Sequence, residues 1–173
     1  MRRLTVLISL TVMLDLAMWS AVLPLLPQYS DDLDLSKLES GVLVAGYSAA
    51  IVIFSIPVGH WSDRLGTKAF TISGCVLMAA ATAVFAFEPG FWLLLTARFA
   101  QGLSSAVSWS SGLAWLSASA SPERRGRVIA IANSAATGGA VCGPLIGGPL
   151  VEAVGLGWAF GCISAEVEIA RSP

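Results

Sequence analysis

The sequence is poor in charge, in histidine and in asparagine. Charged residues make up 12% of its 173 residues and hydrophobic residues 55%, whereas a soluble domain carries about 25% charged residues. The only histidine, His60, lies at the end of an apolar run, so a Ser–His dyad inside an apolar segment is not expected. The sequence has no His-Glu-x-x-His motif, and its three cysteines lack metal-ligand spacing. These shortages predict a protein that is not an enzyme and that uses no cofactor or metal.

Long apolar runs occupy most of the chain. They cover residues 4–27, 41–58, 69–87, 91–114 and 128–151. Each run approaches or exceeds the roughly 20 residues that a helix needs to cross a bilayer. We therefore expect an all-α integral membrane protein whose residues 1–156 form a bundle of about five transmembrane helices. Residues 157–173 hold too short an apolar stretch to span, and we expect an incomplete sixth helix or an altered tail there.

Basic residues fall mainly on one side of this arrangement. If the N-terminus is cytoplasmic, Lys37 is the only basic residue in an outer loop. Seven lie inside, namely Arg2, Arg3, Arg64, Lys68, Arg124, Arg125 and Arg127. This asymmetry follows the positive-inside rule and predicts a cytoplasmic N-terminus. The net charge of −1 offers no basic face to a nucleic acid. The absence of an Asn-x-Ser/Thr sequon fits a bacterial inner membrane.

A charged segment separates the second apolar run from the third. Residues 59–68 read Gly-His-Trp-Ser-Asp-Arg-Leu-Gly-Thr-Lys. In so apolar a chain, charges are expected only where water or a partner receives them, so we predict a cytoplasmic loop here. Its pattern, G-x-x-x-D-R-x-G-x-K, consists of Gly59, Asp63, Arg64, Gly66 and Lys68.

The fourth apolar run contains Arg98-Phe99-Ala100-Gln101-Gly102. An arginine this deep costs roughly 2.5–3.5 kcal/mol on membrane-insertion scales, so Arg98 should face protein, a cavity or a counter-ion. Arg98, Gly102, Ala106 and Ser110 share one helical ridge, whose small residues allow close packing against a neighbouring helix. A buried ion pair that only orients helices is the alternative to a charge in a substrate cavity.

The fifth apolar run contains Gly139-Ala-Val-Cys-Gly143-Pro144-Leu-Ile-Gly147-Gly148. Its glycines at every fourth position form a groove without side chains, into which another helix backbone fits closely. Pro144 removes one helical hydrogen bond and is expected to bend the helix. Ordinary helix–helix packing of the G-x-x-x-G kind is the alternative to a role in conformational exchange.

Together these three patterns resemble motifs of the major facilitator superfamily of transporters. The charged segment resembles the loop between its helices 2 and 3, although Thr67 stands where a basic residue is more usual. The arginine segment resembles the R-x-x-Q-G motif of helix 4, and the glycine segment resembles the helix 5 motif of the antiporter branch. The resemblance covers roughly residues 15–148. It implies the N-terminal half of a drug:proton antiporter-like protein in the plasma membrane. Residues 59–68 would then be a gating loop, and the glycine ridge would lie at the seam with a C-terminal half.

Asp15 is the remaining charge inside an apolar run. It lies roughly 16 Å along its helix, and Arg98 lies roughly 10 Å from the opposite face, at 1.5 Å per residue. In a hydrocarbon core about 30 Å thick the two groups have similar depths, and we expect an ion pair between them. Such a pair is either permanent and structural, or it opens so that the carboxylate carries a proton or a cation. Trp19, one turn further on, offers an aromatic wall for a cation.

These residues and the resemblance lead to one functional expectation. We expect Asp15, Trp19, Arg98 and Gln101 to line a cavity for substrate and protons. The predicted function is proton-coupled efflux of small, cationic or amphipathic molecules by alternating access. Its partners would be the bilayer, the small-molecule substrate, protons and a missing C-terminal half. A truncated fragment without activity and a facilitator of another small metabolite are the alternatives.

Overall fold

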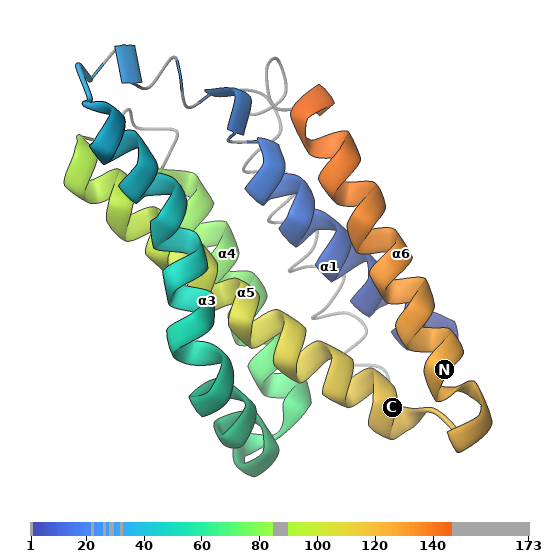
Figure 1. The fold of residues 1–173 in the computed structure, drawn as a ribbon. Coiled ribbons are helices and arrows are strands. Elements are labelled where there is room, and N and C mark those ends of the chain that lie inside the picture. The colour runs from blue at the N-terminus through green and yellow to red at the C-terminus, as the bar shows by residue number, and fades with distance from the viewer. Residues whose placement is uncertain are drawn as a thin grey trace.

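Five long helices form the part of the chain that the structure describes (Figure 1). The structure is a computed structural model, and it describes residues 2–146 apart from residues 22, 26, 28, 29, 32 and 85–89. Its elements are α1 (Arg2–Ala21), the 3₁₀ turn η1 (Leu23–Leu25), α3 (Lys37–Leu65), α4 (Thr67–Val84), α5 (Phe91–Ser119) and α6 (Pro122–Ile146). The described residues contain no strand. The predicted all-α fold with five long helices is confirmed, whereas residues 147–173, including the predicted incomplete sixth helix, lie outside the described residues.

Helix α5 is the centre of the bundle. It packs along α3 and α4, and it also contacts α1 and α6. Helices α1 and α6 form a second closely packed pair, which lies side by side in Figure 1. Residues from α1 and α5 therefore meet in the interior, and this is where Asp15 lies.

The predicted orientation agrees with the direction of the helices. The start of α1, the end of α3 and the start of α6 lie toward the same end of the bundle in Figure 1. That end carries the seven basic residues that the sequence places inside, Arg2, Arg3, Arg64, Lys68, Arg124, Arg125 and Arg127. Lys37 begins α3 at the opposite end. The charge asymmetry of the sequence is thus a property of the folded bundle, as the positive-inside rule requires.

The charged segment is not the loop that the sequence predicted. Helix α3 continues to Leu65, only Gly66 lies outside a helix, and α4 begins at Thr67. Gly66 has a φ of +100°, and its N–H donates a hydrogen bond of 3.0 Å to the carbonyl of Ser62. Because 29 residues of helix measure about 43 Å, α3 extends beyond a hydrocarbon core of about 30 Å. Asp63 and Arg64 therefore reach water while remaining helical, and both are exposed.

The basic segment between the fourth and fifth apolar runs is also helical. The basic residues Arg124, Arg125 and Arg127 lie in the first two turns of α6, which begins at Pro122. Proline is well tolerated at the first helical position, where its missing N–H costs no hydrogen bond. Arg125 donates a hydrogen bond of 3.1 Å from Nε to the carbonyl of Ser117, which ties the end of α5 to the start of α6.

Within the described part of the chain, three helices are by themselves long and apolar enough to cross a membrane. They are the segments Arg2–Ala21, Lys37–Arg64 and Pro122–Leu145, and Thr67–Thr82 of α4 is a shorter apolar helix. Helix α5 has 29 residues, which is sufficient length, but it carries Arg98, Gln101 and several serines. Since α5 is wrapped by its neighbours, these polar side chains face protein rather than lipid.

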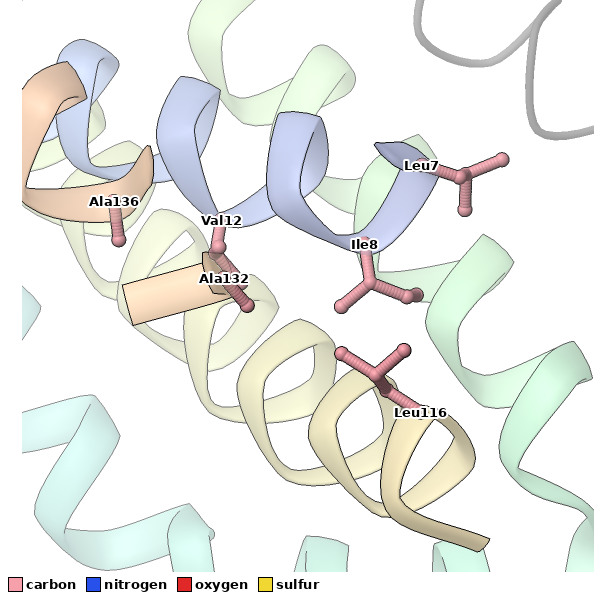
Figure 2. Packing of buried hydrophobic residues seen from close by; sticks show 6 residues of the cluster. All are labelled: Leu7, Ile8, Val12, Leu116, Ala132 and Ala136. Carbon is pink, nitrogen blue, oxygen red and sulfur yellow. The ribbon is translucent and has the colours of Figure 1, made fainter. Parts of the chain in front are cut away.

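Buried hydrophobic side chains of α1, α5 and α6 pack together. Their cluster contains Leu7, Ile8, Val12, Leu116, Ala132 and Ala136. Figure 2 shows Ile8 of α1 directed toward Leu116 of α5, while Val12 lies beside Ala132 of α6. Because lipid tails are as apolar as these side chains, the cluster stabilises the bundle through van der Waals packing rather than through removal of apolar surface from water.

Glycines bring the helix backbones of α3, α4 and α5 close together. A β-carbon at Gly102 of α5 would overlap the carbonyl oxygen of Tyr47 in α3, and it would come within 2.9 Å of the β-carbon of Ala50. A β-carbon at Gly74 of α4 would come within 3.2 Å of the carbonyl oxygen of Ser104. The predicted close packing along the ridge of α5 is confirmed at Gly102, and its partner there is α3.

Candidate substrate cavity and the buried charges around it

Asp15 is held by α5 in the interior of the bundle. Its side chain is 4% exposed. Oδ2 accepts a hydrogen bond of 2.6 Å from the hydroxyl of Ser105 and one of 2.8 Å from the indole N–H of Trp109. Oδ1 is buried without a hydrogen-bond partner among the described residues. One carboxylate oxygen is therefore fixed, and the other has an unfilled capacity to accept a proton or to contact a cation.

Tyr47 of α3 also belongs to the group of side chains around Asp15. None of the sequence motifs contains this residue. Its side chain is 4% exposed, and its hydroxyl donates a hydrogen bond of 2.9 Å to Oγ of Ser105. The three helices α1, α3 and α5 are thus joined by the chain Tyr47–Ser105–Asp15. The signal in the sequence was a single tyrosine in the middle of an apolar span, where a hydroxyl needs a partner.

Arg98 lies in a separate polar group. Its side chain is 1% exposed. Nη1 donates a hydrogen bond of 3.2 Å to Oε1 of Gln101, and Nε2 of Gln101 donates one of 3.1 Å to Oγ1 of Thr82 in α4. Cζ of Arg98 lies 5.8 Å from the centre of the Tyr47 ring, within cation–π range. Nε and Nη2 are buried without a hydrogen-bond partner among the described residues.

The predicted ion pair between Asp15 and Arg98 is therefore wrong. Asp15 bonds to Ser105 and Trp109, which follow Arg98 by about 10 and 16 Å along α5, at 1.5 Å per residue. The depths had been taken from the ends of the apolar runs, and this does not account for the tilt of α5 across the bundle (Figure 1). Tyr47 occupies the position between the two groups, with its hydroxyl toward Asp15 and its ring against Arg98.

A cavity of about 340 Å³ opens beside the Asp15 group. Its wall is formed by α1, α3 and α5 and contains three aromatic residues, Trp19, Tyr47 and Trp109. The other lining residues are Leu16, Ser48, Ile51, Ser55, Ser105, Ala106 and Ser110. Trp19 and Tyr47 lie 6.1 Å apart between ring centres. The buried indole N–H of Trp19 has no hydrogen-bond partner among the described residues.

Two of the four predicted cavity residues thus lie at this cavity. Trp19 lines it, and Asp15 lies directly behind Ser105 and Trp109. Arg98 and Gln101 are not among the residues that line it and lie toward Thr82 of α4. The wall is mostly apolar and aromatic with a few hydroxyls, which is typical of a pocket for a small organic molecule.

The glycine segment of α6 packs against α1 of the same chain. A β-carbon at Gly139 would overlap the carbonyl oxygen of Met13, and one at Gly143 would overlap the side chain of Ser20 and the backbone of Ala17. The expected position at a seam with another half is therefore corrected for Gly139 and Gly143. Pro144 is exposed on α6, and Gly147 and Gly148 lie outside the described residues.

The residues of the predicted gating loop lie at the basic end of the bundle. Asp63, Arg64, Gly66 and Lys68 are exposed, and Gly59 is partly buried in α3. A β-carbon at Gly59 or Gly66 would meet nothing within 4 Å. This surface therefore leaves room for another part of a protein to approach.

A family model described as the Major Facilitator Superfamily matches residues 8–165. The chain belongs to this superfamily. Superfamily members are multi-pass membrane transporters, so the predictions of family and of membrane class are confirmed. Helices α1 to α6 correspond to the N-terminal half of such a transporter.

Individual relatives support the same assignment. The chain is 34% identical over 152 residues to the MFS-type transporter ppzB of Metarhizium majus, which covers 84% of the chain and 33% of that protein. It is 33% identical over 136 residues to the quinolone resistance protein NorA of Staphylococcus aureus, which covers 76% of the chain and 34% of that protein. The chain therefore spans about a third of the length of these curated relatives.

A solved structure has the same fold. The crystal structure of the human organic anion transporter MFSD10 (TETRAN) matches with a TM-score of 0.76 and 22% sequence identity. The match covers 96% of this chain and 46% of that one. The helical arrangement around α5 is thus the arrangement found in a solved membrane transporter.

Proposed function

We propose that this chain forms the N-terminal bundle of a secondary transporter that exports small cationic or amphipathic molecules in exchange for protons. The observation that carries the proposal is Asp15, a carboxylate in the interior of a membrane helix beside an aromatic cavity. Ionisable residues inside membrane spans are costly, and they typically belong to ion or substrate pathways.

The geometry around Asp15 supports binding of a positive charge. Ser105 and Trp109 hold Oδ2, whereas Oδ1 has no partner among the described residues. The cavity wall next to it carries three aromatic side chains, whose ring faces attract cations. A proton and a cationic substrate would compete for the same carboxylate. That competition is a physical basis for exchange of one against the other.

The relatives support a drug-like substrate. NorA is named as a quinolone resistance protein, and the matched part of NorA covers 76% of this chain. A cavity with a volume of about 340 Å³, lined by aromatic and hydroxyl side chains, suits a small amphipathic molecule.

In an alternating-access mechanism, the charged segment at residues 59–68 and the glycines of α6 would also have roles. We place Asp63, Arg64 and Lys68 at the cytoplasmic surface, where a second bundle would rest against them in one of the two states. The tight contact of Gly139 and Gly143 with α1 would let these two helices move as one unit. In this proposal the cavity is completed by a C-terminal half, in the plasma membrane of the cell. The absence of a glycosylation sequon favours a bacterial inner membrane, while the relatives include a fungal protein.

Equilibrium binding tests the proposal. The purified chain in lipid nanodiscs would be dialysed against radiolabelled tetraphenylphosphonium, a permanent aromatic cation. We expect saturable binding that weakens by roughly 10-fold or more in Asp15→Asn, because two opposite charges about 4 Å apart attract by about 4 kcal/mol at an effective protein dielectric of about 20. Asp63→Asn is the matched control, since it removes an exposed carboxylate by the same substitution. Equal affinity in the wild-type chain and in Asp15→Asn would contradict the proposal.

A further inference from the structure

Among the described residues, Tyr47 is the one side chain that belongs to the cavity wall, to the Asp15 group and to the surroundings of Arg98. It lines the cavity, its hydroxyl donates to Ser105, and its ring lies against the Arg98 guanidinium. Asp15 is the carboxylate that would attract a cation, and Arg98 is a buried positive charge that would repel one. Tyr47 lies between the carboxylate group that would attract the cation and the guanidinium that would repel it.

The hydroxyl of Tyr47 determines which way the Ser105 hydroxyl points. A serine hydroxyl has one proton to donate, and its oxygen accepts hydrogen bonds. Tyr47 occupies an acceptor site of Ser105 at 2.9 Å, and Ser105 donates its only proton to Oδ2 of Asp15 at 2.6 Å. Without the Tyr47 hydroxyl, Ser105 is free to rotate and to bond to the carbonyl four residues earlier in α5, as serines in helices commonly do.

The ring of Tyr47 separates Arg98 from the cavity. Arg98 is 1% exposed and does not line the cavity, whereas Tyr47 does. The guanidinium lies within cation–π distance of the ring, so the π-electrons of the ring offset part of its charge. A smaller, non-aromatic side chain at position 47 would bring the positive charge of Arg98 to the cavity.

We propose that Tyr47 is a positioning residue of the cation site, which aims the Ser105 hydroxyl at Asp15 and screens the cavity from Arg98. This inference rests on the proposed function, because it concerns the cation that the Asp15 site would bind. The groups that face Asp15 are Ser105 and Trp109 of α5 and Tyr47 of α3, whose hydroxyl bonds to Ser105 and also lies near the carboxylate itself. On the α6 side, α1 meets the uncharged Ala132, Ala136, Gly139 and Gly143.

Substitutions at position 47 separate the two effects. Tyr47→Phe keeps the ring and removes the hydroxyl, and we expect tetraphenylphosphonium to bind about 3- to 10-fold more weakly, the equivalent of one hydrogen bond between neutral groups. Tyr47→Leu removes both and should weaken binding further. Thr71→Val is the matched control, because it removes a buried hydroxyl that pairs with Ser111 on α5, away from the cavity.

A double-mutant cycle tests the route through Ser105. If Tyr47 acts through that hydroxyl, Tyr47→Phe should cause no further loss of binding in a Ser105→Ala chain. Losses that simply add would overturn the inference. Wild-type affinity in Tyr47→Phe, together with weakened binding in Asp15→Asn, would overturn the role of Tyr47 and leave the proposed function standing.

A spectroscopic measurement tests the positioning without any ligand. The indole N–H of Trp109 donates to the same oxygen of Asp15 as Ser105 does. Its ¹H–¹⁵N resonance, assigned by its loss in Trp109→Phe, should shift in Tyr47→Phe and remain in place in Thr71→Val. Because phenylalanine keeps the aromatic ring, a shift would report the lost hydroxyl. An unmoved resonance would show that Tyr47 does not position the Asp15 group.

Discussion

The hydroxyl of Ser105 donates a hydrogen bond of 2.6 Å to the carboxylate of Asp15, which joins α5 to α1 in the interior of the bundle. Both side chains are buried, at 3% and 4% exposure. In a low-dielectric interior, a hydrogen bond to a charged group is stronger than one between neutral groups. The bond therefore fixes one oxygen of the only acidic side chain buried among the described residues.

Asp15 should be required for coupling as well as for binding. In membrane vesicles from cells that express the complete transporter, an imposed proton gradient is expected to drive uptake of a cationic dye. Asp15→Asn should abolish or strongly reduce this uptake, because the amide carries no charge and cannot exchange a proton. Fluorescence quenching of the dye measures the uptake. Gradient-driven uptake at the wild-type rate in the variant would remove Asp15 from the coupling mechanism.

The seam between α1 and α6 should not tolerate a single methyl group at Gly139. Gly139→Ala places a β-carbon on the carbonyl oxygen of Met13, and that backbone has to shift. We expect a loss of about 1–3 kcal/mol, the usual cost of overpacking, seen as a lower melting temperature in detergent. Gly138→Ala is the matched control, since a β-carbon there meets nothing within 4 Å. Equal melting temperatures for the two variants would show that the seam is looser than the structure has it.

Arg98 should contribute little to stability, because two of its guanidinium nitrogens have no hydrogen-bond partner among the described residues. Replacing even a complete buried ion pair with apolar side chains of similar volume is often neutral or stabilising by about 1–4 kcal/mol, because burying charge is costly. We expect Arg98→Met to melt at the same or a higher temperature than the wild-type chain. Arg64→Met, at an exposed position, serves as the reference for the same substitution. A marked drop in the melting temperature of Arg98→Met alone would reveal a charge partner that stabilises Arg98.

The chain by itself is expected to bind a cation without transporting it. Alternating access requires a second bundle that closes the cavity from the other side, and the curated relatives are about three times as long as the matched segment. After reconstitution of the 173-residue chain in liposomes, dye flux under a proton gradient should not exceed that of empty liposomes. Saturable flux that is lost in Asp63→Asn would point instead to a self-assembling half-transporter.

The sequence alone determined the number of long helices and the superfamily, and it predicts their direction in the membrane. These follow from quantities that are local along the chain. The length of an apolar run determines whether it spans, and the distribution of arginine and lysine determines which end faces the cytoplasm. The patterns at residues 59–68, around Arg98 and around Gly143 pointed to the superfamily because together they resemble three of its motifs.

The sequence predicted correctly which charged residues are exposed at the end of the bundle, but it did not predict the backbone conformation of those residues. Residues 59–68 were predicted as a loop because they are charged, yet α3 includes them up to Leu65. Charged residues indicate contact with water but not the absence of a helix. A helix that is longer than the membrane is thick has both of its ends in water. Gly66, with its positive φ, ends the helix there.

Only the tertiary structure decided which side chains meet. Depth along a helix gives one coordinate, whereas contact also depends on the rotation of each helix about its axis and on its tilt. For this reason Asp15 and Arg98 were expected to pair, yet Asp15 bonds to Ser105 and Trp109. The glycines of α6 predicted a close approach but not its partner, which is α1. The position of Tyr47 between the two charges depends on the packing of α3 against α5. A local sequence pattern does not show which neighbour a buried hydroxyl will bond to.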